Sequence, residues 1–228
     1  MADSNFVSAL IIVDLQEDFC PPNGSLAVAE GRDIATPVNE LLSLPSFAIR
    51  VATQDWHPKD HISFASNHTG KEPFSDFATV VNPHNPDEKY DTRLWPVHCV
   101  QDTKGAELIP EVDVTRIDEL VKKGTDPRVE MYSAFYDPFK SPRVSDSGLV
   151  RILKDKGVTH VYVVGLAYDY CVKSTAIDAA SEGFITYVVE EATRPVATAE
   201  WAECTKALEK EGVTVVRMDG EEVKRLRA

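Results

Sequence analysis

The segment from His160 to Gly183 constrains the fold more than any other part of this sequence. It opens with the apolar run VYVV at residues 161–164, which predicts a strand that is buried on both faces. Small residues follow, and apolar residues then recur at helical spacing from 172 to 180, before the helix-terminating Gly183. A strand, a turn and a helix in this order predict one unit of a parallel sheet, with Cys171 at the start of the helix.

The position of Cys171 has two interpretations. The N-terminus of a helix favours a thiolate over a thiol, and a strand-to-helix junction can project a nucleophile out of the sheet. A small buried side chain is the alternative, because free cysteines are commonly buried. This segment alone leaves both interpretations open.

Five other segments have the composition of strands, and helical patterns lie between several of them. We therefore expect an α/β fold, with a mainly parallel six-stranded sheet flanked by helices in a single doubly wound domain over residues 1–228. Helices are expected to begin at Thr36, Ser145 and Thr198. Residues 57–112 lack sustained periodicity and predict a loop-rich insertion that covers the site. The other predicted strands are residues 9–13, 47–53, 116–123, 185–189 and 213–218, with a short helix as the alternative for residues 116–123.

Composition excludes several classes of partner. The chain has 24 Lys and Arg against 37 Asp and Glu, a net charge of −13, which would repel a nucleic acid backbone. The apolar stretch at residues 7–13 is too short for a signal peptide or a membrane span. Four scattered cysteines indicate a reducing compartment, so we expect a cytoplasmic protein, with the nucleus as an alternative. A homo-oligomer is compatible with the sequence.

Chemically capable side chains follow four of the predicted strands. They are Asp14, Asp55 with His57, Lys123 and Cys171. Right-handed crossovers would bring these strand ends to one edge of the sheet. A carboxylate near a thiol can take its proton and return it to a leaving amine, and an ammonium can stabilise the anions, which favours acyl transfer from an amide. Taken alone, Lys123 would more often be a solvated surface charge.

A metal site is also indicated. Asp55 and His57 come from one loop, and His98 can add a second imidazole from the far end of the insertion. Two imidazoles and a carboxylate with open positions suit a catalytic zinc, iron or manganese ion. His61 is either a further ligand or a partner that contacts a ligand. The pattern Asp-x-His at residues 55–57 is short, and such a pattern also arises by accident.

Aromatic residues surround these polar groups in the sequence, at Phe19, Trp56, Trp95 and Tyr132. A flat apolar pocket with a few polar anchors suits a small aromatic ligand, although core packing explains any single one of them. The segment after the first strand, DLQEDFCPPNGS, has neither GxGxxG nor a Walker A motif. A nucleotide therefore has no glycine loop to bind it.

Five motifs together resemble the nicotinamidases, within the isochorismatase-like family of cysteine hydrolases, and the fungal type in particular. They occur in the family's order across most of the chain: VDLQEDF, TQDWHPKDHISF, LWPVHC, KKG followed by YSAFYD, and GLAYDYCVKSTAIDA. The resemblance implies a flavodoxin-like fold and hydrolysis of nicotinamide to nicotinate and ammonia through a cysteine acyl-thioester.

The resemblance also implies roles for particular residues. The catalytic triad would be Asp14, Lys123 and Cys171, and the backbone N–H groups of Ala167 and Cys171 would form an oxyanion hole after a cis peptide bond at Leu166–Ala167. One divalent ion, zinc first and iron or manganese as alternatives, would bind Asp55, His57 and His98. The pyridine ring would lie between Phe19, Trp95 and Tyr132.

Two rival functions remain at this point. The first is a related hydrolase that cleaves a vinyl ether or another small amide, and Cys171 counts against the vinyl ether because members with that chemistry lack the cysteine. The second is a non-catalytic module that binds a small molecule.

Overall fold

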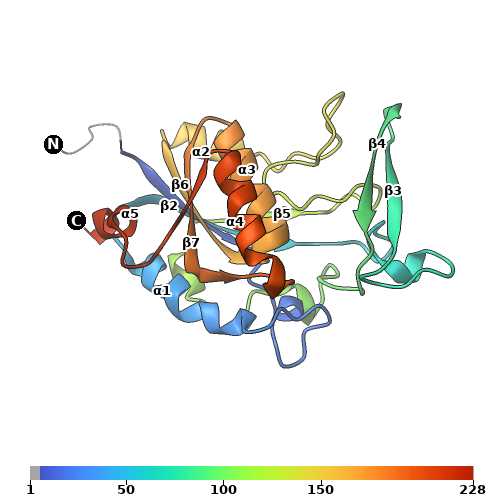
Figure 1. Ribbon diagram of the computed structural model, residues 1–228, viewed down its shortest axis with the longest axis horizontal. Coiled ribbons are helices and arrows are strands. Elements are labelled where there is room, and N and C mark those ends of the chain that lie inside the picture. The colour runs from blue at the N-terminus through green and yellow to red at the C-terminus, as the bar shows by residue number, and fades with distance from the viewer. Residues whose placement is uncertain (1–5, 228) are drawn as a thin grey trace.

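The computed structural model describes residues 6–227, and its central feature is a six-stranded sheet in the order β5–β2–β1–β6–β7–β8 (Figure 1). Every neighbouring pair in this sheet is parallel, which confirms the predicted α/β fold. The strands are β1 (Ser8–Val13), β2 (Phe47–Asp55), β5 (Glu119–Lys123), β6 (His160–Leu166), β7 (Ile185–Arg194) and β8 (Val213–Val216).

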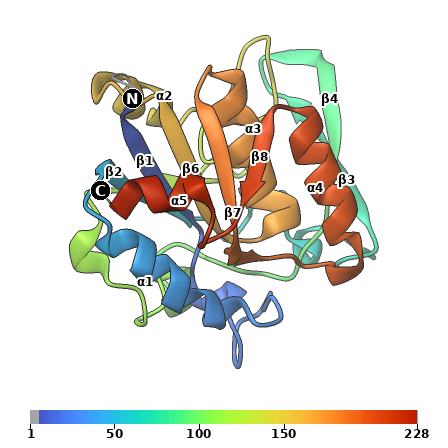
Figure 2. The ribbon, with the colours of Figure 1, turned by 60° about the vertical axis from the view of Figure 1, so that its left-hand side comes forward.

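Helices cover both faces of the sheet, because the central strands are apolar on both. In β1, Leu10 and Ile12 pack in the core that includes α1 and α5, whereas Ile11 and Val13 pack in the core that includes α2, α3 and α4. The layers can be followed in Figure 2. The helices are α1 (Ala35–Ser43), α2 (Leu149–Asp155), α3 (Lys173–Ser181), α4 (Trp201–Lys210) and α5 (Glu221–Lys224).

The strand order changes direction between β1 and β6. From β1 the chain builds β2 and β5 on one side, and from β6 it builds β7 and β8 on the other. Val13 at the end of β1 pairs with Gly165 of β6. Open α/β sheets bind ligands in the crevice at such a switch point, so Asp14 and the segment after β6 lie where a site is expected.

The predicted loop region at 57–112 contains an antiparallel hairpin, which the sequence analysis missed. Its strands are β3 (Phe77–Asn82) and β4 (Asn85–Arg93). The hairpin stands apart from the central sheet, at the end of the molecule opposite α5 (Figure 1). Most of its side chains are at least partly exposed, so the strands lack the apolar alternation that would have revealed them.

Two α-helices begin later than predicted. α2 begins after Gly148 rather than at Ser145, and the Ser147 hydroxyl accepts the Leu149 N–H. Thr198 opens a 3₁₀ turn, and α4 itself begins only at Trp201. The third predicted strand was too long, because β5 begins only at Glu119. Within residues 6–227, no helix combines the length and apolarity needed to cross a membrane.

Candidate active site

A buried lysine lies at the centre of the site. Lys123 ends β5 and is only 1% exposed. Its ammonium lies 2.9 Å from Asp14 Oδ2 and 2.5 Å from Asp55 Oδ1, and it donates to the Met131 carbonyl at 3.1 Å. Burial opposes its charge, but Asp14 and Asp55 outweigh burial and hold the pKa of Lys123 well above its usual value. The solvated alternative for Lys123 is therefore wrong.

Asp14 follows β1 and is completely buried. Its Oδ1 accepts a 2.6 Å hydrogen bond from the Thr53 hydroxyl, which belongs to the neighbouring strand β2. Burial raises the pKa of Asp14 to about 6, although Lys123 opposes the shift. A carboxylate with a pKa near neutral is suited to act as a general base and acid.

Cys171 lies in a π-helical turn, Tyr168–Val172, that leads into α3. Its sulfur is 3.6 Å from Lys123 Nζ, and its sulfur, a carboxylate oxygen of Asp14 and one of Asp55 all lie within 4.8 Å of one another. Burial raises the pKa of Cys171 well above its usual value, while Lys123 opposes. Burial thus favours the thiol over the thiolate, so a base has to take its proton.

The predicted metal ligands converge on the same crevice. Asp55, His57 and His98 each offer a ligand atom within 4.8 Å of the other two, and all three residues are buried. His57 Nδ1 bonds to the Gly124 carbonyl at 2.8 Å, whereas its Nε2 has no hydrogen-bond partner and faces Asp55 Oδ2 at 3.6 Å. A buried imidazole nitrogen without a partner is costly unless a cation occupies its lone pair, so these residues fit a metal ion.

The remaining contacts of the two imidazoles support the same assignment. His98 Nδ1 bonds to the Pro96 carbonyl at 2.7 Å, which directs Nε2 away from the backbone. Burial lowers the pKa of His98 to about 4, and His57 adds to this shift, so His98 is neutral as a ligand must be.

His61 lies beside the predicted metal ligands, but both of its ring nitrogens already have partners. Its ring stacks on His57 with centroids 4.0 Å apart. Its Nδ1 lies 2.8 Å from the Ser63 hydroxyl and its Nε2 lies 3.1 Å from the Val129 carbonyl. Both nitrogens are thus engaged by the protein, which favours the role of a partner over that of a ligand.

Glu130 belongs to this site but was missed from the sequence. It is 3% exposed, and its carboxylate lies within 4.8 Å of ligand atoms of both His57 and His61. Burial raises the pKa of Glu130, with His57 opposing. The segment before Tyr132 carries no strand or helix pattern, so nothing in the sequence indicated a buried acid there.

An aromatic pocket opens over the sulfur. The predicted ring-binding residues Phe19, Trp95 and Tyr132 line it together with Cys171 and Ala167. Tyr170, which the sequence analysis did not select, adds a further ring 4.9 Å from Trp95. Trp56 packs instead against the main core and under the Lys122 ammonium, 3.4 Å from its ring centroid.

The backbone of the predicted oxyanion hole lies at the same end of β6. The Leu166–Ala167 peptide bond is cis, as the resemblance implied. The Tyr170 and Val172 N–H groups donate to the Ala167 carbonyl, at 3.0 and 3.1 Å, and this holds the turn that carries Cys171. All the residues predicted for catalysis, metal binding and ring binding therefore lie around one crevice.

Known proteins provide an independent line of information. Residues 8–220 match the isochorismatase domain family. A nicotinamidase from Acinetobacter baylyi is 43% identical over 188 residues, which cover 82% of this chain and 81% of that protein.

Two solved structures are similar along almost the whole chain. The yeast nicotinamidase bound to the inhibitor nicotinaldehyde has a TM-score of 0.86 and 36% identity, covering 92% of this chain and 100% of that one. The pyrazinamidase of Pyrococcus horikoshii in complex with zinc has a TM-score of 0.71 and 33% identity, covering 92% and 98%. Bacterial and fungal proteins thus match alike, so the fungal type stays a prediction.

Proposed function

Since the chain belongs to the isochorismatase family, we propose that it acts as an amidohydrolase that converts nicotinamide to nicotinate and ammonia. The observation that carries this proposal is the buried cluster of Asp14, Lys123 and Cys171 at the floor of an aromatic pocket. A thiol beside a carboxylate of near-neutral pKa is suited to amide cleavage, and the rings around it suit a flat heterocycle. The relatives named nicotinamidase support this substrate over other small amides.

Acylation would begin with proton transfer from the Cys171 thiol to Asp14. The thiolate attacks the carboxamide carbon, and the backbone N–H groups of Ala167 and Cys171 stabilise the oxyanion. Asp14 then returns the proton to the nitrogen, the C–N bond breaks, and ammonia leaves a thioester on Cys171. Lys123 stabilises the anionic members of the cluster throughout, because it lies between Asp14 and the sulfur.

Deacylation would use the same carboxylate. Asp14 takes a proton from a water molecule, the resulting hydroxide attacks the thioester carbonyl, and the C–S bond breaks to give nicotinate. The proton returns to the sulfur, so the protein ends the cycle unchanged. Phe19, Trp95 and Tyr132 hold the ring, and by surrounding it they limit the access of other water.

Asp55, His57 and His98 would hold a divalent metal ion, with zinc as the proposed species because the Pyrococcus horikoshii relative binds zinc. A bound divalent ion supplies a Lewis acid that can polarise a ligand or lower the pKa of a water molecule. The Asp55 carboxylate would serve both the ion and Lys123, since its two oxygens face different groups.

The homo-oligomer and the cytoplasmic location stay predictions of the sequence.

Ammonia release from nicotinamide by the purified protein tests this proposal, with nicotinate measured alongside. We expect equal amounts of both products from the wild type and none above background from Cys171→Ala. Cys204→Ala is the matched control, because Cys204 is also a buried cysteine but lies on α4, and it should keep full activity. A metal-loaded wild type that releases no ammonia would reject the assignment.

A further inference from the structure

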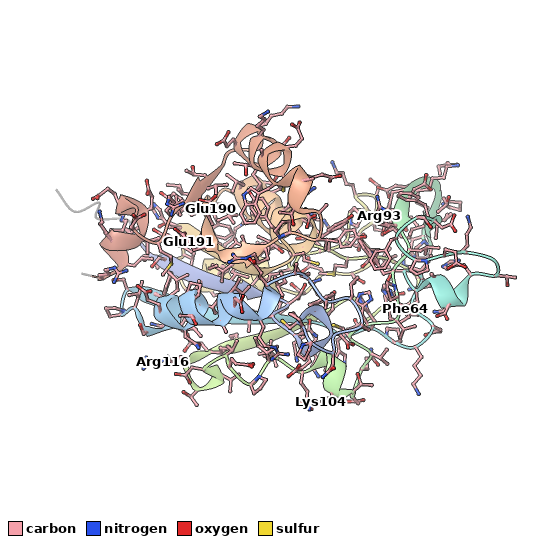
Figure 3. All side chains as sticks on the ribbon, turned by 60° about the horizontal axis from the view of Figure 1, so that its bottom comes forward. Phe64, Arg93, Lys104, Arg116, Glu190 and Glu191 are labelled. Carbon is pink, nitrogen blue, oxygen red and sulfur yellow. The ribbon has the colours of Figure 1, made fainter. Side chains whose placement is uncertain are left out.

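The β3–β4 hairpin adds no strand to the central sheet, and none of the catalytic steps uses its residues. One face of β4 nevertheless contacts residues that line the substrate pocket. Tyr90 and Thr92 are two positions apart, so their side chains leave the same face of the strand. Both bond to the segment that carries Glu130 and Tyr132. Figure 3 shows Arg93, the last residue of β4, at the same end of the molecule as Phe64, whose ring lies 5.3 Å from that of His98.

Thr92 completes a hydrogen-bonded chain through the two rings of the pocket wall. The Trp95 indole N–H donates to the Tyr132 oxygen at 3.0 Å, and the Thr92 hydroxyl lies 3.2 Å from that same oxygen. An indole nitrogen can only donate, so the Tyr132 oxygen accepts from Trp95, and a hydroxyl can exchange a second hydrogen bond with Thr92 in either direction. Burial also raises the pKa of Tyr132 well above its usual value, which keeps the phenol protonated.

Tyr90 fixes the backbone two residues earlier. Its hydroxyl donates to the Glu130 carbonyl at 2.8 Å and accepts the Glu130 N–H at 2.9 Å, so one side chain satisfies both backbone groups. The next residue, Met131, gives its carbonyl to Lys123 at 3.1 Å. The Tyr90 ring packs against Phe139, 4.9 Å between centroids, which anchors the hydroxyl in a small core under the hairpin.

The position of this wall decides what fits the pocket. Trp95 and Tyr132 both line the pocket together with Cys171, so a displacement of either ring changes the shape of the space beside the sulfur. We propose that Tyr90 and Thr92 are positioning residues, through which the hairpin holds Tyr132 and Trp95 in place to bind a flat ring. This inference rests on the proposed function, because the ring is that of nicotinamide.

The test compares the kinetics of threonine variants on the two strands. Thr92→Val removes the hydroxyl that hydrogen-bonds to Tyr132, and we expect KM for nicotinamide to rise about three- to tenfold with kcat within about twofold. Thr92→Ser keeps the hydroxyl and should restore the wild-type KM. Tyr90→Phe should raise KM and also lower kcat, because Met131 and Lys123 would shift together.

Thr79→Val is the matched control. Thr79 is an exposed threonine on β3 whose hydroxyl bonds to Asp91 at 2.7 Å, away from the pocket. It should leave both constants unchanged. An unchanged KM in Thr92→Val, an equal loss in Thr92→Ser, or an equal rise in Thr79→Val would each overturn the proposal.

A second measurement does not depend on catalysis. The indole N–H of Trp95 can be followed by ¹⁵N NMR among the three tryptophans of the chain. Its exchange with solvent should be slow in the wild type and at least severalfold faster in Thr92→Val. A wild type without amidase activity would reject the proposed function, whereas equal exchange in both proteins would reject the positioning role.

Discussion

Asp14 must be ionised before it can take a proton from Cys171. Burial raises its pKa to about 6 and Lys123 keeps it from rising further, so the ionised form dominates at neutral pH. The activity should therefore fall as the pH drops through about 6, because the protonated carboxyl cannot act as a base.

The Thr53 hydroxyl gives a way to move this limb of the pH profile. It donates to Asp14 Oδ1 at 2.6 Å and so favours the ionised carboxylate. In Thr53→Val the pKa of Asp14 should rise by about half a unit to one unit, the equivalent of one hydrogen bond. The measurement is kcat/KM between pH 4.5 and 8, in which the acidic limb should shift upward.

Thr186→Val provides the control for this shift. Thr186 is also a buried strand threonine, and its hydroxyl donates to the Phe184 carbonyl at 3.1 Å instead of to a carboxylate. Its limb should stay at the wild-type pH. A Thr53→Val profile that overlays the wild type would show that Asp14 is not the group that titrates.

The sequence predicted which residues form the site, but it did not predict their protonation states. Asp14 was expected at the end of a strand and Cys171 at the start of the helix after one, and the structure places them there. The expected effect of the helix N-terminus on Cys171 is outweighed by burial, which depends on every element that covers the sulfur. Burial of that kind has no local signature in the chain.

At the scale of elements, the turn after β5 sets the position of a metal ligand. Gly124 has a positive φ of 63°, and a Cβ at this position would lie 2.4 Å from the His57 ring. Its carbonyl also accepts the His57 Nδ1–H, so the turn fixes which nitrogen faces Asp55. The backbone after β5 thus orients the imidazole that follows β2, and the close approach of the two requires a glycine at position 124.

Gly124→Ala should therefore weaken metal binding. The added methyl group has to displace the His57 ring, and we expect the affinity for Zn²⁺ to fall at least about tenfold, the usual scale for losing an orienting contact. Competition with a chromogenic chelator measures it. Gly157→Ala is the control, since Gly157 has a φ of 66° but no atom within 4 Å of its added Cβ. An equal loss of Zn²⁺ affinity in both variants would mean that backbone strain, rather than contact with His57, is responsible. A wild-type affinity in Gly124→Ala would contradict the role of this turn.

The elements that the sequence predicted are those that bury apolar runs. β1 and β6 are completely buried, and their composition alone revealed them. β4 reads NPDEKYDTR and has one fully buried residue, Thr92, so its pairing with β3 depends on contacts that only the folded chain makes. Glu130 was missed for the same reason, because Tyr90 and His57 define its surroundings from distant parts of the chain.

At the scale of the whole molecule, the site joins the two halves of the sheet. Its groups come from β1, β2 and β5 on one side and from the turn after β6 on the other. Its buried carboxylates are Asp14, Asp55 and Glu130, against the single ammonium of Lys123. Three carboxylates and one ammonium sum to two negative charges when all are ionised, which a divalent cation would balance.

Metal binding should consequently stabilise the entire chain. A ligand at a hundred times its Kd adds about 2.7 kcal/mol to the free energy of unfolding. For a chain of 228 residues this corresponds to a rise in Tm of about 5–10 °C. Calorimetry of the chelator-treated protein, before and after Zn²⁺ is returned, measures the difference. We expect one transition in both cases, because a single domain shares the site among all its central strands.

Two histidine variants separate this effect from general binding of zinc to the surface. His98→Ala removes a ligand from the crevice, so its Tm should no longer respond to Zn²⁺. His68→Ala changes an imidazole that bonds to the Ile62 carbonyl, outside the group of metal ligands, and should keep the full response. A wild-type Tm that is the same with and without the ion would contradict the metal site, and two separate transitions would contradict the single domain. A response that survives in His98→Ala would place the ion elsewhere on the protein.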